Sequence, residues 1–176
     1  MAEKGRIRIR KLTDPAFAAL GGTWAKLDPP KGKPTAKDPV RKVKFWADLV
    51  QVDLGVAKDG TPNTVASIGL CRVERRDTST DPLEFHAATG EGILPLGADI
   101  VLLLAKACAS DPPAKKDVLA FGVPGDSVVC LPKGTWHWAP AVKEGDGDPV
   151  DVVIILPPET FRKDCTVREL TLGLRV

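Results

Sequence analysis

The chain contains only two histidines, and each lies in a short motif rich in groups that could do chemistry. His86 follows Glu84 by two positions and precedes Glu91 in the stretch "LEFHAATGEGILPLG". His137 follows a Pro-Lys-Gly turn in the stretch "GDSVVCLPKGTWHWAP". Two imidazoles and two carboxylates that converge on one cavity would suit a borderline divalent ion such as manganese, iron, nickel or zinc. The same groups could also carry protons near neutral pH.

Strand geometry predicts how these side chains could meet. Residues 84 and 86 point to one face of a strand, because side chains alternate along it. A turn through "AATG" would return Glu91 beside them, and the Pro-Lys-Gly turn would bring His137 in from a neighbouring strand. Inside a barrel, the shared face is the lumen. The structural alternative is that each histidine is a hydrogen-bonded core residue and that Glu84 is a solvated charge.

The elements that must position these residues are mostly strands. "RIRIRKL" alternates apolar and charged residues, which predicts a strand, and "TDPAFAALGG" predicts a short helix capped by Thr13 or Asp14. The lysine- and proline-rich segment 26–44 is expected to be a surface loop insertion. We then expect about ten strands, within residues 44–55, 64–76, 82–89, 92–97, 99–108, 117–123, 126–132, 135–142, 151–158 and 168–176. This spacing predicts an all-β, closed or double-sheet antiparallel fold in a single domain, residues 1–176.

Composition and charge narrow the function classes. The chain of 176 residues is 43% hydrophobic and 27% charged, as expected for a globular protein. Its net charge of +2 gives no field that would favour nucleic acid, and its longest apolar run is too short to cross a membrane. The four cysteines form no Cys-x-x-Cys pair, so we expect reduced thiols. A cytoplasmic protein that acts on a small molecule, without nucleic acid or membrane partners, is the expectation.

The two histidine motifs resemble the paired motifs of the cupin superfamily, with Glu84 in place of the first histidine of the first motif. Within that superfamily, several features together resemble the ureidoglycolate lyase family, formerly called ureidoglycolate hydrolase. They are Glu84-x-His86 with Glu91 and Pro95, the later Trp-His pair, the N-terminal "LTDPAFAALGG" and the "FWADL" segment. The resemblance runs in order from about residue 11 to residue 170.

This resemblance implies a cupin-like antiparallel β-barrel, or double-stranded β-helix, with a short N-terminal helix. It implies a homodimeric enzyme of purine and allantoin breakdown that splits ureidoglycolate into glyoxylate and urea, with a divalent metal ion and no organic cofactor. The metal set would be Glu84, His86, Glu91 and His137. In the reaction, His137 would act as general base, Glu91 or Glu84 would return the proton, and Lys133 would hold the substrate carboxylate.

The chain departs from the family pattern at several positions. Trp138 stands where a second histidine is common, Glu91 replaces a glutamine, and Lys44 replaces an arginine. Trp136 and Trp138 flank His137, so both should face away from the lumen, toward a partner subunit or within the sheet packing. Two other functions remain open: a metal-dependent cupin dioxygenase or isomerase acting on a small polar acid, and a non-catalytic cupin that binds a small molecule.

Overall fold

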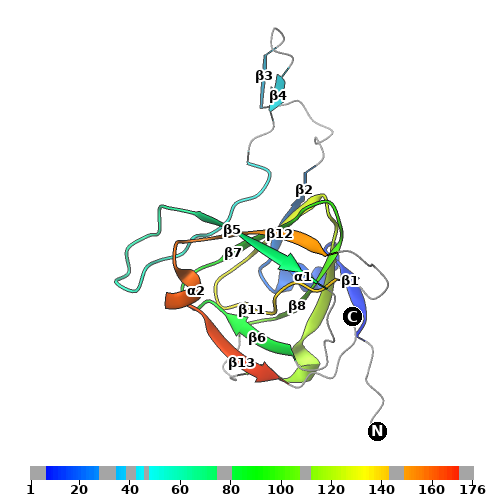
Figure 1. Cartoon of the computed structure of the whole chain (residues 1–176), viewed down its shortest axis with the longest axis vertical. Helices are drawn as coiled ribbons and strands as arrows, with labels where there is room; N and C mark the ends of the chain where they lie inside the picture. Colours follow the sequence, from blue (N-terminus) through cyan, green and yellow to red (C-terminus); the bar gives the residue numbers. More distant parts are fainter. Residues whose placement is uncertain are drawn as a thin grey trace.

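The computed structural model describes residues 7–27, 35–38, 43–45, 48–74, 81–107, 112–142 and 149–170, which build two facing β-sheets (Figure 1). One sheet has six strands in the order β1-β9-β8-β11-β6-β13, and the other has five in the order β2-β10-β7-β12-β5. A separate ladder of β3 and β4 stands away from both sheets. The strands are β1 (Ile9–Lys11), β2 (Thr23–Lys26), β3 (Ala36–Asp38), β4 (Val43–Phe45), β5 (Ser67–Val73), β6 (Asp81–Phe85), β7 (Glu91–Pro95), β8 (Ile100–Ala105), β9 (Leu119–Val123), β10 (Ser127–Leu131), β11 (Trp136–His137), β12 (Val150–Leu156) and β13 (Thr166–Leu170). The predicted all-β fold of two packed sheets is confirmed.

Strand β8 shows how the sequence builds the core, because all six of its residues are buried. Alternate residues point to opposite faces of a strand. Ile100, Leu102 and Leu104 enter the core cluster between the two sheets, together with residues such as Ile93 and Val129 of the opposite sheet. The alternating residues of β8 belong to a second cluster, which also contains Leu83, Ala120 and Trp136. The six-stranded sheet is therefore covered on both faces.

The predicted N-terminal helix is present as α1 (Pro15–Ala19). Asp14 is its cap: the carboxylate accepts a hydrogen bond of 2.9 Å from the backbone N–H of Ala16, and Pro15 occupies the first turn. Phe17 is fully buried and meets Phe121 edge to face, with ring centroids 5.3 Å apart. The helix thus closes one side of the core mainly through Phe17, and Ala16 and Leu20 pack against the same cluster.

Several elements differ from the sequence predictions. Strand β2 was not expected, and it pairs with β10 as the edge of the five-stranded sheet. Segment 26–44 was expected to be a loop, yet its described part contains β3 and β4, and the rest lies outside the described residues. Residues 48–55 form no strand, and the residues at the two ends of this stretch, Asp48 and Gly55, have φ values of 54° and 63°. Among the described ladders, all are antiparallel except the parallel pair β1–β9.

Two short helical elements also went unpredicted: a 3₁₀ turn at Lys115–Asp117 and the helix α2 (Thr160–Lys163). Helix α2 joins β12 to β13 and is held by the hydroxyl of Thr160, which donates to the carbonyl of Pro157 at 2.8 Å. In the described parts of the chain, no helix has the length and apolar character needed to cross a membrane.

Trp136 packs within the six-stranded sheet, as one of the two sequence-based alternatives had it. Its side chain is buried in the second hydrophobic cluster, together with Leu83 and Ala120. The centroid of its ring lies 4.4 Å from that of the Phe85 ring. Trp138 packs against the same cluster. The buried Trp136 ring is therefore a packing residue of the sheet.

Gly90 is expected to tolerate no side chain. A Cβ at this position would lie 2.6 Å from the carbonyl oxygen of Asp53 and 2.7 Å from that of Leu131, so the backbone would have to move. We expect Gly90→Ala to lower the free energy of unfolding by about 1–3 kcal/mol, the usual cost of overpacking, in a urea titration. Gly69→Ala is the matched control, because a Cβ there meets its nearest atoms at 3.8 Å. Equal stability of the two variants would contradict the expectation.

Candidate metal centre and active site

Three adjacent elements bring the predicted site residues together. His137 in β11 pairs directly with Glu84 in β6, and Glu91 begins β7 in the opposite sheet. Leu83 and Phe85 pack in the second hydrophobic cluster, the one that contains Trp136. Glu84 and His86 instead line a cavity, together with His137 and Glu91. The alternation of β6 therefore turns residues 84 and 86 inward.

One oxygen of Glu91 is the meeting point of the two histidines. The Nε2 atom of His137 lies 2.9 Å from Glu91 Oε2, and the Nε2 atom of His86 lies 3.4 Å from the same oxygen. The two imidazole rings are tilted, with centroids 5.2 Å apart. Glu84 is more distant, with its Oε1 atom 3.7 Å from His137 Nε2. His86, Glu91 and His137 are all buried.

Backbone carbonyls fix the orientation of both imidazole rings. His86 Nδ1 lies 2.8 Å from the carbonyl oxygen of Asp164, and His137 Nδ1 lies 2.9 Å from that of Thr135. A carbonyl oxygen only accepts hydrogen bonds, so in each ring Nδ1 carries the hydrogen. Both Nε2 atoms are thereby directed at Glu91. This pattern is common in metal sites, where the second ring nitrogen of a ligating histidine is held by a carbonyl or a carboxylate.

The electrostatics of the cluster couple Glu91 to His137. Burial opposes the ionisation of Glu91, but the charges and contacts of His137 and His86 outweigh it and lower the pKa of Glu91 to about 2. Burial also disfavours the charged form of His137, but Glu91, the Thr135 carbonyl and Glu84 outweigh it and raise the pKa of His137 to about 9. Without a metal ion, Glu91 and His137 are therefore both charged at neutral pH.

This coupling predicts a pH dependence of stability in the metal-free protein. The pKa of His137 rises from 6.5 to about 9 on folding, so its contribution is present below pH 6.5 and is lost as the pH rises toward 9. The pKa of Glu91 falls from 4.5 to about 2, so its contribution is present above pH 4.5 and is lost as the pH falls toward 2. We expect the difference in unfolding free energy between wild type and Glu91→Gln to shrink as the pH rises from 6.5 to about 9. Urea titrations with chelator present would measure it, and a constant difference would contradict the coupling.

The cluster fits a metal ion. One donor atom each from His86, Glu91 and His137 lies within 4.8 Å of the others. Glu91 Oε2 and His137 Nε2 are buried, and neither has a hydrogen-bond partner of suitable geometry although they lie close together. A cation between the donors would satisfy both atoms, and two imidazoles with one carboxylate suit zinc, iron or manganese. His86, Glu91 and His137 thus form a group that could hold a metal ion.

One protein family matches the chain over nearly its whole length. The family model described as ureidoglycolate lyase matches residues 4–176. The chain belongs to the ureidoglycolate lyase family. No curated protein matches the chain.

Several oxalate decarboxylase structures are among the solved structures that resemble this chain. A mutant of the Bacillus subtilis oxalate decarboxylase is 17% identical, with a TM-score of 0.38, and the match covers 60% of this chain and 23% of the other. A second oxalate decarboxylase structure is 18% identical, with a TM-score of 0.39, over 81% of this chain and 35% of the other. This chain therefore spans about a quarter to a third of the length of those proteins.

The Pro-Lys-Gly turn before His137 contacts the site through a backbone hydrogen bond to His86. Gly134 adopts a left-handed conformation with φ 77°, which favours glycine, and its N–H donates to the carbonyl of His86 at 2.7 Å. Lys133 is exposed in the same turn and is absent from the residues that line the cavity. Its role as the holder of a substrate carboxylate stays a prediction. The structure brings the other four predicted residues to one cavity.

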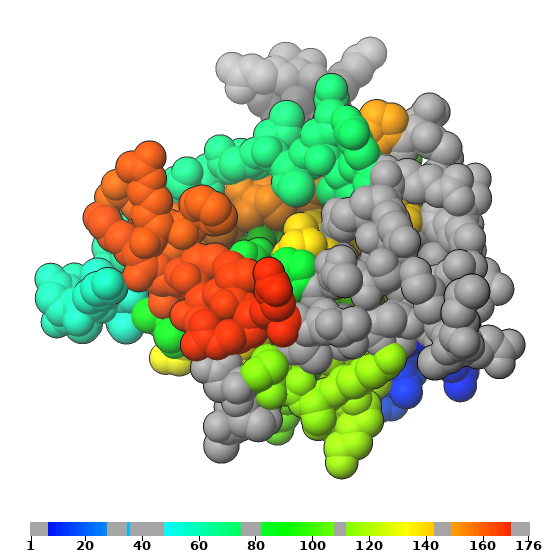
Figure 2. Space-filling model, turned by 60° about the horizontal axis from the view of Figure 1, so that its bottom comes forward, coloured from blue at the N-terminus to red at the C-terminus, as the bar shows by residue number. Residues whose placement is uncertain are grey.

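The cavity at the site has a volume of about 200 Å³ and opens between the two sheet edges. Figure 2 shows a recess between β5 on one side and α2 with β13 on the other, and atoms from the middle of the chain form its floor. Phe161 of α2 lines the cavity and is 79% exposed, although the sequence analysis did not single it out. A large apolar side chain therefore stands at the mouth, where a bound molecule would contact it.

Cys165 is another neighbour of the site that the sequence analysis did not assign. Its Sγ atom donates to Glu84 Oε2 at 3.1 Å. Partial burial, followed by the hydrogen bond and charge of Glu84, raises the pKa of Cys165 to about 12, so the thiol stays protonated at neutral pH. No local sequence signal marks this contact, because it joins residues 81 positions apart.

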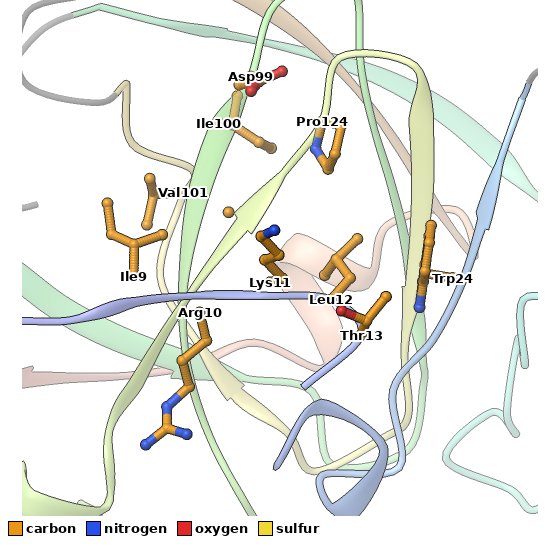
Figure 3. A pocket seen from close by; sticks show the side chains of 11 residues that line it. Ile9, Arg10, Lys11, Leu12, Thr13, Trp24, Asp99, Ile100, Val101 and Pro124 are labelled. Atoms are coloured by element: carbon orange, nitrogen blue, oxygen red, sulfur yellow. The ribbon is translucent and has the colours of Figure 1, made fainter. Parts of the chain in front are cut away.

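A larger cavity, of about 510 Å³, lies beside β1 and is lined by residues such as Leu12, Trp24 and Ile100 (Figure 3). Its described lining contains no histidine, cysteine or glutamate. Of its charged residues, Arg10 donates to Asp14, and Asp99 accepts from the N–H of Gly125. Both histidines of the chain line the smaller cavity instead.

Proposed function

We propose that this protein is a ureidoglycolate lyase, which cleaves ureidoglycolate into glyoxylate and urea. The observation that carries the proposal is the convergence of both histidines of the chain on one oxygen of Glu91, in a chain that belongs to this family over nearly its whole length. The small cavity around this cluster fits a small substrate better than a polymer.

In this proposal, His86, Glu91 and His137 hold a divalent metal ion. When bound, the ion would supply Lewis-acid stabilisation of the negative charge that develops on the substrate hydroxyl oxygen. His137 would lose its Nε2 proton on loading, so metal affinity should rise with pH. Glu84 was predicted as a fourth ligand, but it lies outside the group of three.

In this proposal, Glu84 carries the proton. Its Oε1 atom faces the cavity beside His137, and Oε2 is held by Cys165. Ureidoglycolate has a carbon that bears a hydroxyl, a carboxylate and a ureido nitrogen. As Glu84 removes the hydroxyl proton, the oxygen forms a carbonyl bond, and the carbon–nitrogen bond breaks with its electron pair going to nitrogen. Glu84 then gives the same proton to that nitrogen, so glyoxylate and urea form without net oxidation and without water.

The charge of the cavity supports a requirement for metal. Without a metal ion, its described lining carries two carboxylates, Glu84 and Glu91, against one charged imidazole, His137, and no lysine or arginine. An anionic substrate would be repelled by these carboxylates unless positive charge balanced them. A metal ion on the three donors is the source we propose for that charge.

Release of glyoxylate tests the proposal. Purified protein is stripped with a chelator, reloaded with Zn²⁺, Mn²⁺, Fe²⁺ or Ni²⁺ and supplied with each enantiomer of ureidoglycolate. We expect release well above the spontaneous background in at least one loaded sample, and background release after chelation. Background release in every loaded sample would end the proposal.

A metal-dependent dioxygenase is the second candidate. Two histidines and one carboxylate are the ligand set of many non-haem iron oxygenases, and His86, Glu91 and His137 have this composition. Oxygen consumption by the iron-loaded protein with small polar acids distinguishes it from the lyase, which uses no oxygen.

The biological setting belongs to the same proposal. We propose a cytoplasmic homodimer that acts in purine and allantoin breakdown. Light scattering of the purified protein tests the dimer: a mass of about 18.8 kDa would indicate a monomer instead.

A further inference from the structure

Asp164 contacts the site from a distant part of the chain, between α2 and β13. Its backbone carbonyl accepts the Nδ1–H of His86 at 2.8 Å. Its carboxylate accepts three further hydrogen bonds, each of 3.0 Å, from the N–H groups of Ala87 and Ala88 and from the hydroxyl of Thr89. One residue therefore binds both the ring of His86 and the turn that follows it.

The segment that Asp164 holds connects two of the three donors. His86 precedes it, and Glu91 follows it after Gly90. The far end of this segment is held by Gly90, whose N–H donates to the carbonyl of Asp53 at 3.0 Å and which has no room for a side chain. A shift of residues 87–89 would move His86 relative to Glu91, because the chain between them is short.

The position of Asp164 is itself fixed by the turn of α2. Its N–H donates to the carbonyl of Thr160 at 2.8 Å, and the buried Thr160 hydroxyl is bonded to the carbonyl of Pro157. An ionised carboxylate accepts several hydrogen bonds and donates none, so it matches the three donors. An asparagine in its place would direct an N–H group at one of them.

We infer that Asp164 is a positioning residue, which holds His86 and the turn toward Glu91 in the orientation that the metal group needs. This inference rests on the proposed function for its metal-binding consequence, but the orientation of His86 can be measured without any metal. Residues that orient metal ligands typically change metal affinity about 10–100-fold when they are replaced.

The neighbouring Cys165 extends the same support to the proposed proton carrier. Its thiol holds one oxygen of Glu84, while the other oxygen lies near His137. Residues 164 and 165 therefore place a donor atom of the metal group and the proton carrier from one turn of the chain.

The test compares Asp164→Asn with Asp151→Asn. Asp151 is the matched control, because its carboxylate accepts two hydrogen bonds of 2.8 Å from Arg72 in a surface ion pair of β12 and β5. Long-range ¹H–¹⁵N spectra of the metal-free proteins report the tautomer of each ring, and the chain has only two histidines to assign. Competition with a Zn²⁺-binding dye gives the Kd for Zn²⁺.

We expect Asp164→Asn to move His86 from the pure Nδ1–H tautomer to a mixture and to raise the Kd for Zn²⁺ about 10–100-fold. The ring signals of His137 should stay as in wild type, and Asp151→Asn should match wild type in both measurements. Unchanged His86 signals and an unchanged Kd in Asp164→Asn would overturn the inference. An equal response in the control variant would overturn it as well.

Two outcomes separate this inference from the proposed function. If wild type releases no glyoxylate and binds no Zn²⁺, but His86 still responds to Asp164→Asn, the lyase proposal fails and the positioning role stands. If wild type is an active lyase and Asp164→Asn changes neither measurement, the positioning role fails alone. Should Asp164→Asn not fold, Thr89→Val removes one of the three donors and should show a smaller shift of the same kind.

Discussion

Replacement of His137 by alanine is expected to lower kcat/KM for glyoxylate release by about 10³-fold or more. The variant removes a donor of the metal group and the partner of Glu91, and it leaves that buried carboxylate without its nearest positive charge. Zn²⁺ binding should weaken in parallel. Steady-state kinetics with each metal-loaded protein, together with the dye competition, measure both effects.

A cavity control separates this loss from simple destabilisation. Val129 is fully buried in the core between the sheets and contributes no donor, so Val129→Ala should lower the melting temperature while Zn²⁺ affinity stays near that of wild type. If His137→Ala kept full activity with bound metal, the proposed site would be wrong.

Replacement of Glu91 by glutamine is expected to raise the Kd for Zn²⁺ by about 100-fold or more and to abolish glyoxylate release at limiting metal. The substitution keeps the shape of the side chain but removes the negative charge that both Nε2 atoms face. An amide oxygen is a weaker ligand for zinc than a carboxylate, because it carries no full charge. Titration of the apo-protein with Zn²⁺, followed by activity at each metal concentration, measures the effect.

Glu84→Gln is the informative contrast to Glu91→Gln. If Glu84 carries the proton, this variant should keep its Zn²⁺ affinity within a few-fold of wild type and lose about 10²-fold in kcat, the usual scale of general acid–base catalysis. If Glu84 is instead the fourth ligand that the sequence predicted, its Zn²⁺ affinity should fall as it does in Glu91→Gln. The two roles therefore give opposite metal titrations.

The strand content of the protein was readable from local patterns. The alternating residues of β1 follow the two-residue period of a strand. The continuous apolar run of β8 is bounded by turn residues, which is typical of a buried strand. The helix α1 was readable for the same kind of reason, since its cap, its proline and its glycine stop lie within ten residues. Strand β2 was not predicted, because a pattern of only four residues is too short to identify a strand.

The shared orientation of Glu84 and His86 could also be predicted from local sequence. Two residues apart on a strand, they had to share a face, and the structure turns both into the cavity. Lys133 lies in the turn before His137, as its sequence position predicts, but its side chain is exposed and does not line the cavity. Sequence order could place Lys133 near His137, and it could not say which way Lys133 points.

By itself, the sequence determined the all-β fold class, the short first helix and the four residues that meet at one cavity, because each depends on periods and spacings within a few residues. Only the tertiary structure decided that Glu91 is shared by both Nε2 atoms while Glu84 lies farther out, and that Asp164 and Cys165 hold the site from about 80 positions away. The physical reason is that hydrogen bonds and ion pairs form or fail with changes of a few tenths of an ångström in the distances between side chains from different strands. Such distances are set by how the two sheets pack together, and no local pattern encodes them.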